Sequence, residues 1–169
     1  VCSLIYLLVS SAISIINLMA FANAAQSLGL GQRMLDLAVS YTKDRYQFNK
    51  PIGSFQAVKH LLANVAIKLE FAKPSVYRAA HSLLKCVPKR SLHISHAKIA
   101  ACEAASLAAK NSLQAHGAMG YTWEYDLHIF IKRSLVLSST GGDFGFHKAR
   151  LLDSLLADDF QLGPTATFS

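Results

Sequence analysis

Residues 28–62 read LGLGQRMLDLAVSYTKDRYQFNKPIGSFQAVKHLL, and this stretch decides the fold. From Leu28 to Tyr41, apolar residues recur at the three- and four-residue spacing of an amphipathic helix. Residues 49–53, NKPIG, interrupt that spacing, because proline and glycine terminate helices. The spacing resumes after Ser54, which is a suitable N-cap residue. The stretch therefore predicts two long helices joined by a short connection.

Helical spacing continues on both sides of this stretch and predicts helices over about 11–46, 54–84, 91–115, 124–137 and 146–156, with a kink at Pro74. No segment alternates polar and apolar residues for long enough to form a sheet. Because long helices with short connections pack as antiparallel neighbours, we expect an all-α fold. The arrangement predicted is an up-and-down four-helix bundle with a short additional C-terminal helix, in which residues 1–169 form a single domain.

The composition of the chain excludes several classes of protein. The three cysteines, Cys2, Cys86 and Cys102, lack the spacing of a disulfide framework or a zinc site, which favours a reducing compartment such as the cytoplasm or the mitochondrial matrix. The seven histidines form no pair at i and i+4, so we expect no metal site, and we expect the pair His93 and His96 on the surface. Hydrophobic residues make up 52% of the chain, which indicates a surface partly covered by oligomer contacts or by another domain.

The net charge of +7 indicates either anionic partners or a solvated basic surface. The basic residues are spread along the chain without forming a run, so we expect no binding to nucleic acid. The phosphates of a small cofactor are sufficient to explain the positive charge.

The N-terminal stretch is open to more than one interpretation. No charged residue precedes Arg33, and residues 4–25 are almost wholly apolar. Such a run is compatible with a membrane span or a secretory signal, although the positively charged start of a signal peptide is absent. Serine and asparagine residues dilute the run, and it continues into an amphipathic helix, so we favour a buried core helix. A secreted or membrane-anchored protein is the alternative.

Two segments, one after each of two predicted long helices, carry a family resemblance. Residues 41–60, YTKDRYQFNKPIGSFQAVKH, contain an arginine, then Gln-Phe, then Pro-Ile and then Phe-Gln at the start of the next helix. Residues 114–124, QAHGAMGYTWE, follow the pattern Gln-x-x-Gly-x-x-Gly-Tyr-Thr, and Arg133 lies nine residues beyond them. In this order and at this separation, the segments resemble the C-terminal helical domain of the acyl-CoA dehydrogenase family.

The resemblance implies a fold, a cofactor and partners. It implies a C-terminal four-helix bundle that follows an N-terminal helical domain and a middle β-domain, in a homo- or hetero-oligomer. It also implies FAD as the cofactor, shared with another domain or subunit, an acyl-CoA substrate, and an electron-transfer flavoprotein as a possible acceptor. Because the sequence contains neither preceding domain, we expect the isolated chain to be inactive.

The resemblance also assigns residues to a flavin site. It implies cofactor contacts at the following positions: Arg45, Gln47, Phe48, Gln114, Gly117, Ala118 and Gly120. The guanidinium of Arg45 would bind a pyrophosphate, and its alternative is a charge at the end of a helix. Gly117 and Gly120 would adopt positive φ and admit the cofactor to the backbone, and their alternative is a helix C-cap. Asn49 and Ala118 replace glycines of the family, and Phe48 could also be a core anchor.

The catalytic base of the family has no counterpart in this sequence. The family places a glutamate at one of two positions, which correspond here to Gly142, counted from Arg133, or to Met19, counted back from Arg45. Neither residue accepts a proton. Asp143 is the nearest carboxylate, and its alternative is a turn residue that binds its own backbone. Two hypotheses follow: an FAD-contacting bundle that is inactive alone, or a non-catalytic helical subunit or interaction module.

Overall fold

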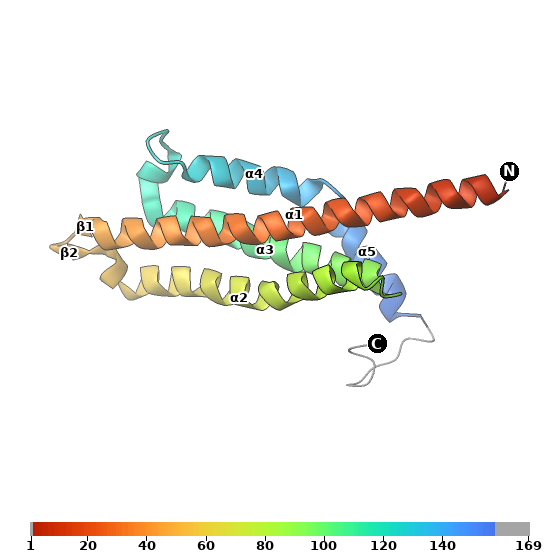
Figure 1. Cartoon of the computed structure of the whole chain (residues 1–169). Helices are drawn as coiled ribbons and strands as arrows, with labels where there is room; N and C mark the ends of the chain where they lie inside the picture. Colours follow the sequence, from red (N-terminus) through yellow and green to blue (C-terminus); the bar gives the residue numbers. More distant parts are fainter. Residues whose placement is uncertain (1, 158–169) are drawn as a thin grey trace.

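The computed structural model describes residues 2–157, with side chains from Leu8 onward. Four helices of this part run alternately up and down: α1 (Cys2–Asp44), α2 (Gln56–Leu84), α3 (Arg90–His116) and α4 (Leu127–Ser139). A fifth helix, α5 (Phe144–Leu155), lies at the end of the bundle opposite the connection between α1 and α2 (Figure 1). The predicted all-α class and up-and-down bundle with a short additional helix are confirmed.

Helix α3 forms the centre of the bundle because its side chains are small. Its alanines are buried between α1 and α2, in a core that also contains Met34, Val65 and Leu69. A Cβ atom at Gly31 of α1 would lie 3.4 Å from the Cα atom of Ala105, so the two helix backbones approach closely at this point. Small residues on α3 therefore set the short distance between the helices, and packing supplies most of the stability.

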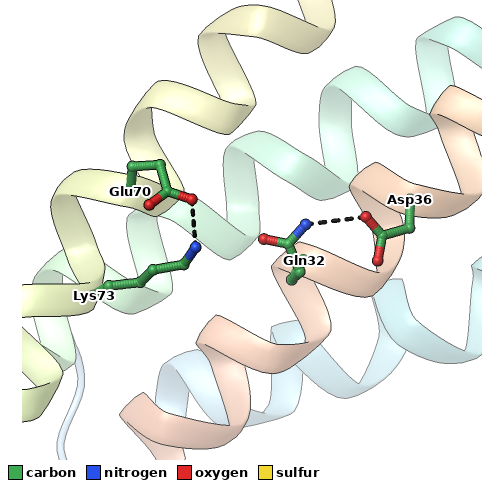
Figure 2. Close-up of polar contacts among 4 residues, drawn as sticks. All are labelled: Gln32, Asp36, Glu70 and Lys73. Atoms are coloured by element: carbon green, nitrogen blue, oxygen red, sulfur yellow. Dashed lines mark hydrogen bonds and ion pairs between the residues drawn. The ribbon is translucent and has the colours of Figure 1, made fainter.

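Polar contacts on the outer faces of the helices are local. Figure 2 shows Gln32 donating to Asp36 along α1, at 3.0 Å, and Lys73 paired with Glu70 along α2. Such exposed pairs one helical turn apart contribute only about 0.2–0.5 kcal/mol each. The contacts of Figure 2 therefore lie on the surface and do not determine how the helices pack.

The N-terminal end of α1 projects beyond the rest of the bundle (Figure 1). Residues 8–15 are exposed, and the helix joins the core only from Asn17 and Ala20 onward. The expected buried core helix is therefore wrong for residues 8–15 and right for the following turns. Within the described residues, α1 is the one helix whose length and apolar composition would suffice to cross a bilayer, and only 17% of its apolar window is buried.

The connection between α1 and α2 is a small hairpin. Strands β1 (Tyr46–Gln47) and β2 (Lys50–Pro51) pair in an antiparallel manner, and a 3₁₀ turn, η1 (Ile52–Ser54), leads into α2. The two turn residues, Phe48 and Asn49, have φ values of 53° and 61°, as tight two-residue hairpins require.

The start of α2 corrects the predicted N-cap. Phe55 occupies the N-cap position without a side-chain hydrogen bond, and the hydroxyl of Ser54 instead donates to the carbonyl of Pro51 at 2.7 Å. Ser54 therefore closes the 3₁₀ turn. Helix α2 continues as one element through Pro74.

His93 is a second correction, because it lies inside the bundle and not on the surface. Its side chain is 8% exposed, and its Nδ1 atom lies 2.7 Å from the hydroxyl of Ser82 on α2. Burial lowers the pKa of His93 to about 4, and the nearby charges of Arg78 and Lys89 act in the same direction. His93 is therefore a neutral core residue, whereas its neighbour His96 is exposed.

Candidate functional site

The two motif segments lie at the same end of the bundle. The hairpin follows α1, and a second 3₁₀ turn, η2 (Gly117–Tyr121), follows α3, so both occur where two helices that run in the same direction end (Figure 1). Arg45, His116 and Met119 line one cavity of about 390 Å³ at this end. Residues far apart in sequence are thus brought to a common site.

The wall of this cavity is aromatic. The rings of Tyr41 and His116 stack with centroids 4.4 Å apart, and Tyr125 packs edge-on against both. His116 donates from Nδ1 to the carbonyl of Ser112 at 2.7 Å, because a carbonyl only accepts. Burial lowers the pKa of His116, which keeps its ring neutral near pH 7. The lining also includes the carboxylates of Asp44 and Asp126, so the Arg45 guanidinium lies among aromatic rings and two acidic side chains.

The predicted contact residues of the hairpin are exposed. Gln47 lies on strand β1, and the ring of Phe48 is 87% exposed and contacts Phe55 edge-on at 6.3 Å. The interpretation of Phe48 as a core anchor is therefore wrong. Asn49 stands where the family has glycine, yet its φ of 61° is one that asparagine tolerates better than most residues. The replacement therefore preserves the shape of the turn.

The glycines of η2 have different roles. Gly117 adopts a φ of 59°, and a Cβ atom there would meet nothing within 4 Å, so its backbone is open to a ligand. Gly120 is buried, and a Cβ atom there would lie 2.9 Å from Leu113 Cδ1 and 3.1 Å from His116 Cβ. Positive φ is therefore confirmed for Gly117 and wrong for Gly120, where packing requires glycine. Ala118 is exposed, as is Gln114, which lies on the last turn of α3 outside the cavity lining.

The two positions that the sequence predicts as counterparts of the family's base lie on neighbouring segments. A Cβ atom at Gly141 would lie 3.1 Å from the backbone nitrogen of Ala20, so the connection between α4 and α5 touches the turn of α1 that carries Met19. Met19 is 48% exposed. Gly142 has a φ of 97°, and a Cβ atom there would lie 2.6 Å from Phe146 and 2.7 Å from His147. Position 142 is therefore closed to a side chain without local rearrangement.

Asp143 is the N-cap residue of α5. Its Oδ1 atom accepts from the backbone N–H of Phe146 at 2.8 Å and caps the first turn of α5. This contact is the one expected of a turn residue that binds its own backbone, and it engages Oδ1 of Asp143. Among the described residues, no group of three or more potential ligands could hold a metal ion.

Three polar residues that sequence reasoning missed surround the connection between α4 and α5. Lys98, which is 2% exposed, donates to the carbonyls of Leu137 and Thr140, and Asn23 donates to Thr140 from α1. His147 is fully buried and contacts the carbonyl of Gly141 through Nε2 at 3.0 Å. The one sequence signal that could have revealed these contacts was Lys98, a lysine among the alanines of α3.

Comparisons with known proteins identify a family and individual proteins whose sequences are similar to this chain. The sequence profile described as "Acyl-CoA dehydrogenase, C-terminal domain" matches residues 9–156. Acyl-CoA dehydrogenase IpdE2 of Mycobacterium tuberculosis is 40% identical over 111 residues, which are 66% of this chain and 33% of IpdE2. The subunit CarC of the caffeyl-CoA reductase-Etf complex of Acetobacterium woodii is 39% identical over 116 residues, which are 69% of this chain and 30% of CarC.

A solved structure extends the likeness to three dimensions. The ChsE4-ChsE5 complex from Mycobacterium tuberculosis contains a chain that matches with a TM-score of 0.81 and 25% identity, over 89% of this chain and 40% of that chain. The present chain spans about a third of the length of the curated relatives that it matches.

Proposed function

As this chain belongs to the acyl-CoA dehydrogenase family and has the family's C-terminal helical domain, we propose that it forms the flavin-contacting bundle of an enzyme that dehydrogenates acyl-CoA thioesters. The observation that carries the proposal is the shared cavity at the ends of α1 and α3, which is lined by Arg45, by His116 and by Met119 of η2. In this proposal the FAD is held mainly by other polypeptide segments, and the chain is inactive alone.

The residues at this end fit a dinucleotide. The guanidinium of Arg45 offers a planar fork of donors to the pyrophosphate, and the open backbone at Gly117 admits the cofactor closely. Gln47 and Phe48 extend from the hairpin, while Gln114 and Ala118 flank the start of η2. When bound, FAD supplies the acceptor for the hydride that leaves the β-carbon of the acyl group. The chain's own residues bind and orient the cofactor.

The base that removes the α-proton is proposed to come from another polypeptide. Such a base must be a carboxylate in a dry environment, because desolvation raises its pKa toward that needed to attack a carbon acid. Met19 and Gly142 lack a carboxylate, and Asp143 is committed to capping α5. Similarity to a chain of the ChsE4-ChsE5 complex supports a hetero-oligomer, and similarity to CarC supports an electron-transfer flavoprotein as acceptor.

A second candidate function is a non-catalytic helical subunit that retains only the bundle and its contact surfaces. The lack of a carboxylate at Met19 and Gly142 favours this second function, because it is also what a subunit without any catalytic role would show. Formation of a trans-2-enoyl-CoA by an assembly that contains this chain would eliminate it.

The proposal is tested by co-purifying the chain with family members that supply the missing domains, and by measuring flavin absorbance that co-elutes in gel filtration. Arg45→Ala should weaken flavin retention by at least about tenfold, since a charge-assisted hydrogen bond contributes about 1.5–3 kcal/mol. Arg33→Ala is the matched control, because Arg33 is an exposed arginine of α1, the helix that Arg45 directly follows, and lies outside the cavity. A stable complex that remains colourless, or equal retention in both variants, would count against the proposal.

A further inference from the structure

The part of α1 that leaves the bundle is apolar on every side. We call residues 2–16 the projecting end. Residues 8–15 are exposed all around the helix, and none of them is charged. Leu8, Ile13 and Ile15 are 64%, 44% and 60% exposed. A helix that is apolar all round is normally buried in a protein core or in a membrane, and no described part of this chain covers the projecting end.

The few polar groups of the projecting end do not depend on water. Its backbone groups are paired within the helix, and its polar side chains from residue 8 onward are three serines. The hydroxyl of Ser14 donates to the carbonyl of Ser10 at 2.9 Å, a contact that satisfies serine in a helix surrounded by lipid. At about 1.5 Å per residue, the projecting end extends about 22 Å, roughly half the thickness of a bilayer. It therefore matches the depth of one leaflet.

The end of the bundle from which α1 projects is basic. At Asn17, where α1 enters the core, the side chain donates to Ser91 of α3 at 2.8 Å and accepts from Arg150 of α5 at 2.7 Å. Helices α3 and α5 therefore flank the base of the projecting end (Figure 1). Between Glu70 and Glu103 the sequence contains no carboxylate and the following basic residues: Lys73, Arg78, Lys85, Lys89, Arg90 and Lys98.

Several of these positive charges lie next to the apolar segment. Lys85 and Lys89 belong to the connection between α2 and α3, and Arg90 begins α3, directly before Ser91. On α5, Lys148 and Arg150 outnumber the one carboxylate of that helix, Asp153. Because no charged residue precedes Arg33, α1 adds no negative charge here. The base of the projecting end is therefore surrounded mainly by positive charge.

An all-round apolar helix that emerges from a basic surface is complementary to a membrane with anionic lipids. Each lysine or arginine near such a surface strengthens binding by about fivefold, and attachment is stable when an apolar anchor and a basic patch act together. We propose that the chain docks on an anionic membrane surface, with the projecting end of α1 in one leaflet and the connection between α2 and α3 against the headgroups. This surface lies opposite the Arg45 cavity, so the docking does not depend on flavin binding (Figure 1).

Docking is tested by flotation of the full chain with vesicles of phosphatidylcholine, prepared with and without phosphatidylglycerol. We expect partition into the anionic vesicles to be at least about tenfold stronger than into the neutral ones. Added salt should reduce that difference, because it screens the charges. Equal partition into both kinds of vesicle, or no partition into either, would overturn the proposal.

The apolar anchor is tested by a pair of substitutions at exposed positions, Ile13→Gln with Ile15→Gln. Removing two apolar side chains that enter hydrocarbon should weaken partition by at least about tenfold. Ile129→Gln with Leu135→Gln is the matched control, since these residues of α4 are 54% and 62% exposed but lie away from the projecting end. Equal losses in the two pairs would contradict insertion of α1.

The basic patch is tested by Lys85→Gln with Lys89→Gln, which should weaken partition into anionic vesicles by about tenfold or more. Lys43→Gln with Lys59→Gln removes the same charge at the opposite end of the bundle and should have little effect. Equal losses in these two pairs would show that net charge alone drives binding, against the proposed orientation. Circular dichroism verifies that each variant keeps its helices.

The depth of the projecting end distinguishes lipid from a second copy of the chain. Trp123 is the one tryptophan, so Ile13→Trp combined with Trp123→Phe moves the fluorophore into the projecting end. Lipids brominated on their acyl chains should quench this fluorescence when vesicles are added. Lack of quenching, or a chain that sediments as a dimer free of the vesicles, would overturn the proposal.

Discussion

His93 is a neutral imidazole in the core, and this has a consequence for pH dependence. Its pKa is about 4 in the folded protein and 6.5 when unperturbed, so between these values the unfolded chain binds a proton that the folded chain does not. The stability that the neutral form of His93 contributes is therefore fully present above pH 6.5 and is lost as the pH falls toward 4. We expect the urea midpoint to fall between pH 7 and pH 5, with a free-energy change of about 1–3 kcal/mol.

Replacement of His93 by glutamine should make this pH dependence shallower, because the side chain no longer titrates. His60→Gln serves as the control, since His60 is exposed on α2 and lies outside the core. Parallel curves for the parent and His93→Gln would contradict the assignment. Because burial also lowers the pKa values of His116 and His147, the substitution should reduce the slope without abolishing it.

Individual residues were predictable from sequence where a motif carried them. The motifs placed Arg45 and Gly117 near one another, and the structure brings their segments to one end of the bundle. His93 and Lys98 were missed, since burial of a polar side chain depends on partners from other helices that no local pattern identifies. Gly120 was misread because packing and positive φ both select glycine, and sequence alone does not distinguish them.

At the scale of elements, the connection between α4 and α5 should resist a side chain at position 142. Gly142→Ala forces an L-residue into a φ of 97° and places its Cβ atom 2.6 Å from Phe146, so we expect a loss of about 1–3 kcal/mol in unfolding free energy. Gly29→Ala is the control, because Gly29 is exposed inside α1 and has open space around it. That substitution should stabilise the protein by about 0.5–1 kcal/mol. Chemical denaturation of both variants would show opposite shifts, and shifts of the same sign would contradict this account.

The helices were predictable because each has an apolar face with helical spacing, which tertiary packing in this bundle reinforces. Their ends were less predictable. Ser54 is a residue type that commonly caps helices, but its hydroxyl instead donates to the carbonyl of Pro51 and closes the 3₁₀ turn after the hairpin. Two-residue strands also escaped notice, because Tyr46–Gln47 and Lys50–Pro51 are too short to show alternation.

At the scale of the whole molecule, α1 exposes apolar side chains both on its projecting end and on the turn that follows it. Ile15 and Leu18 are 60% and 61% exposed. We expect the chain to associate with itself at high concentration, and Ile15→Gln with Leu18→Gln should weaken this at least about tenfold, given about 1.5–3 kcal/mol per buried aliphatic side chain. Sedimentation equilibrium measures the effect. Ile129→Gln with Leu135→Gln, at 54% and 62% exposure on α4, is the control, and equal effects of both pairs would contradict a special role for α1.

Helix α1 ends at Asp44, directly before Arg45, and carries Met19 near the other end of its packed portion. Since an α-helix rises about 1.5 Å per residue, the two positions stand roughly 39 Å apart. One copy therefore presents Arg45 and the turn that carries Met19 to surroundings that do not overlap. Under the proposed function, we expect damage confined to one end to be complemented by a second copy that is damaged only at the other end.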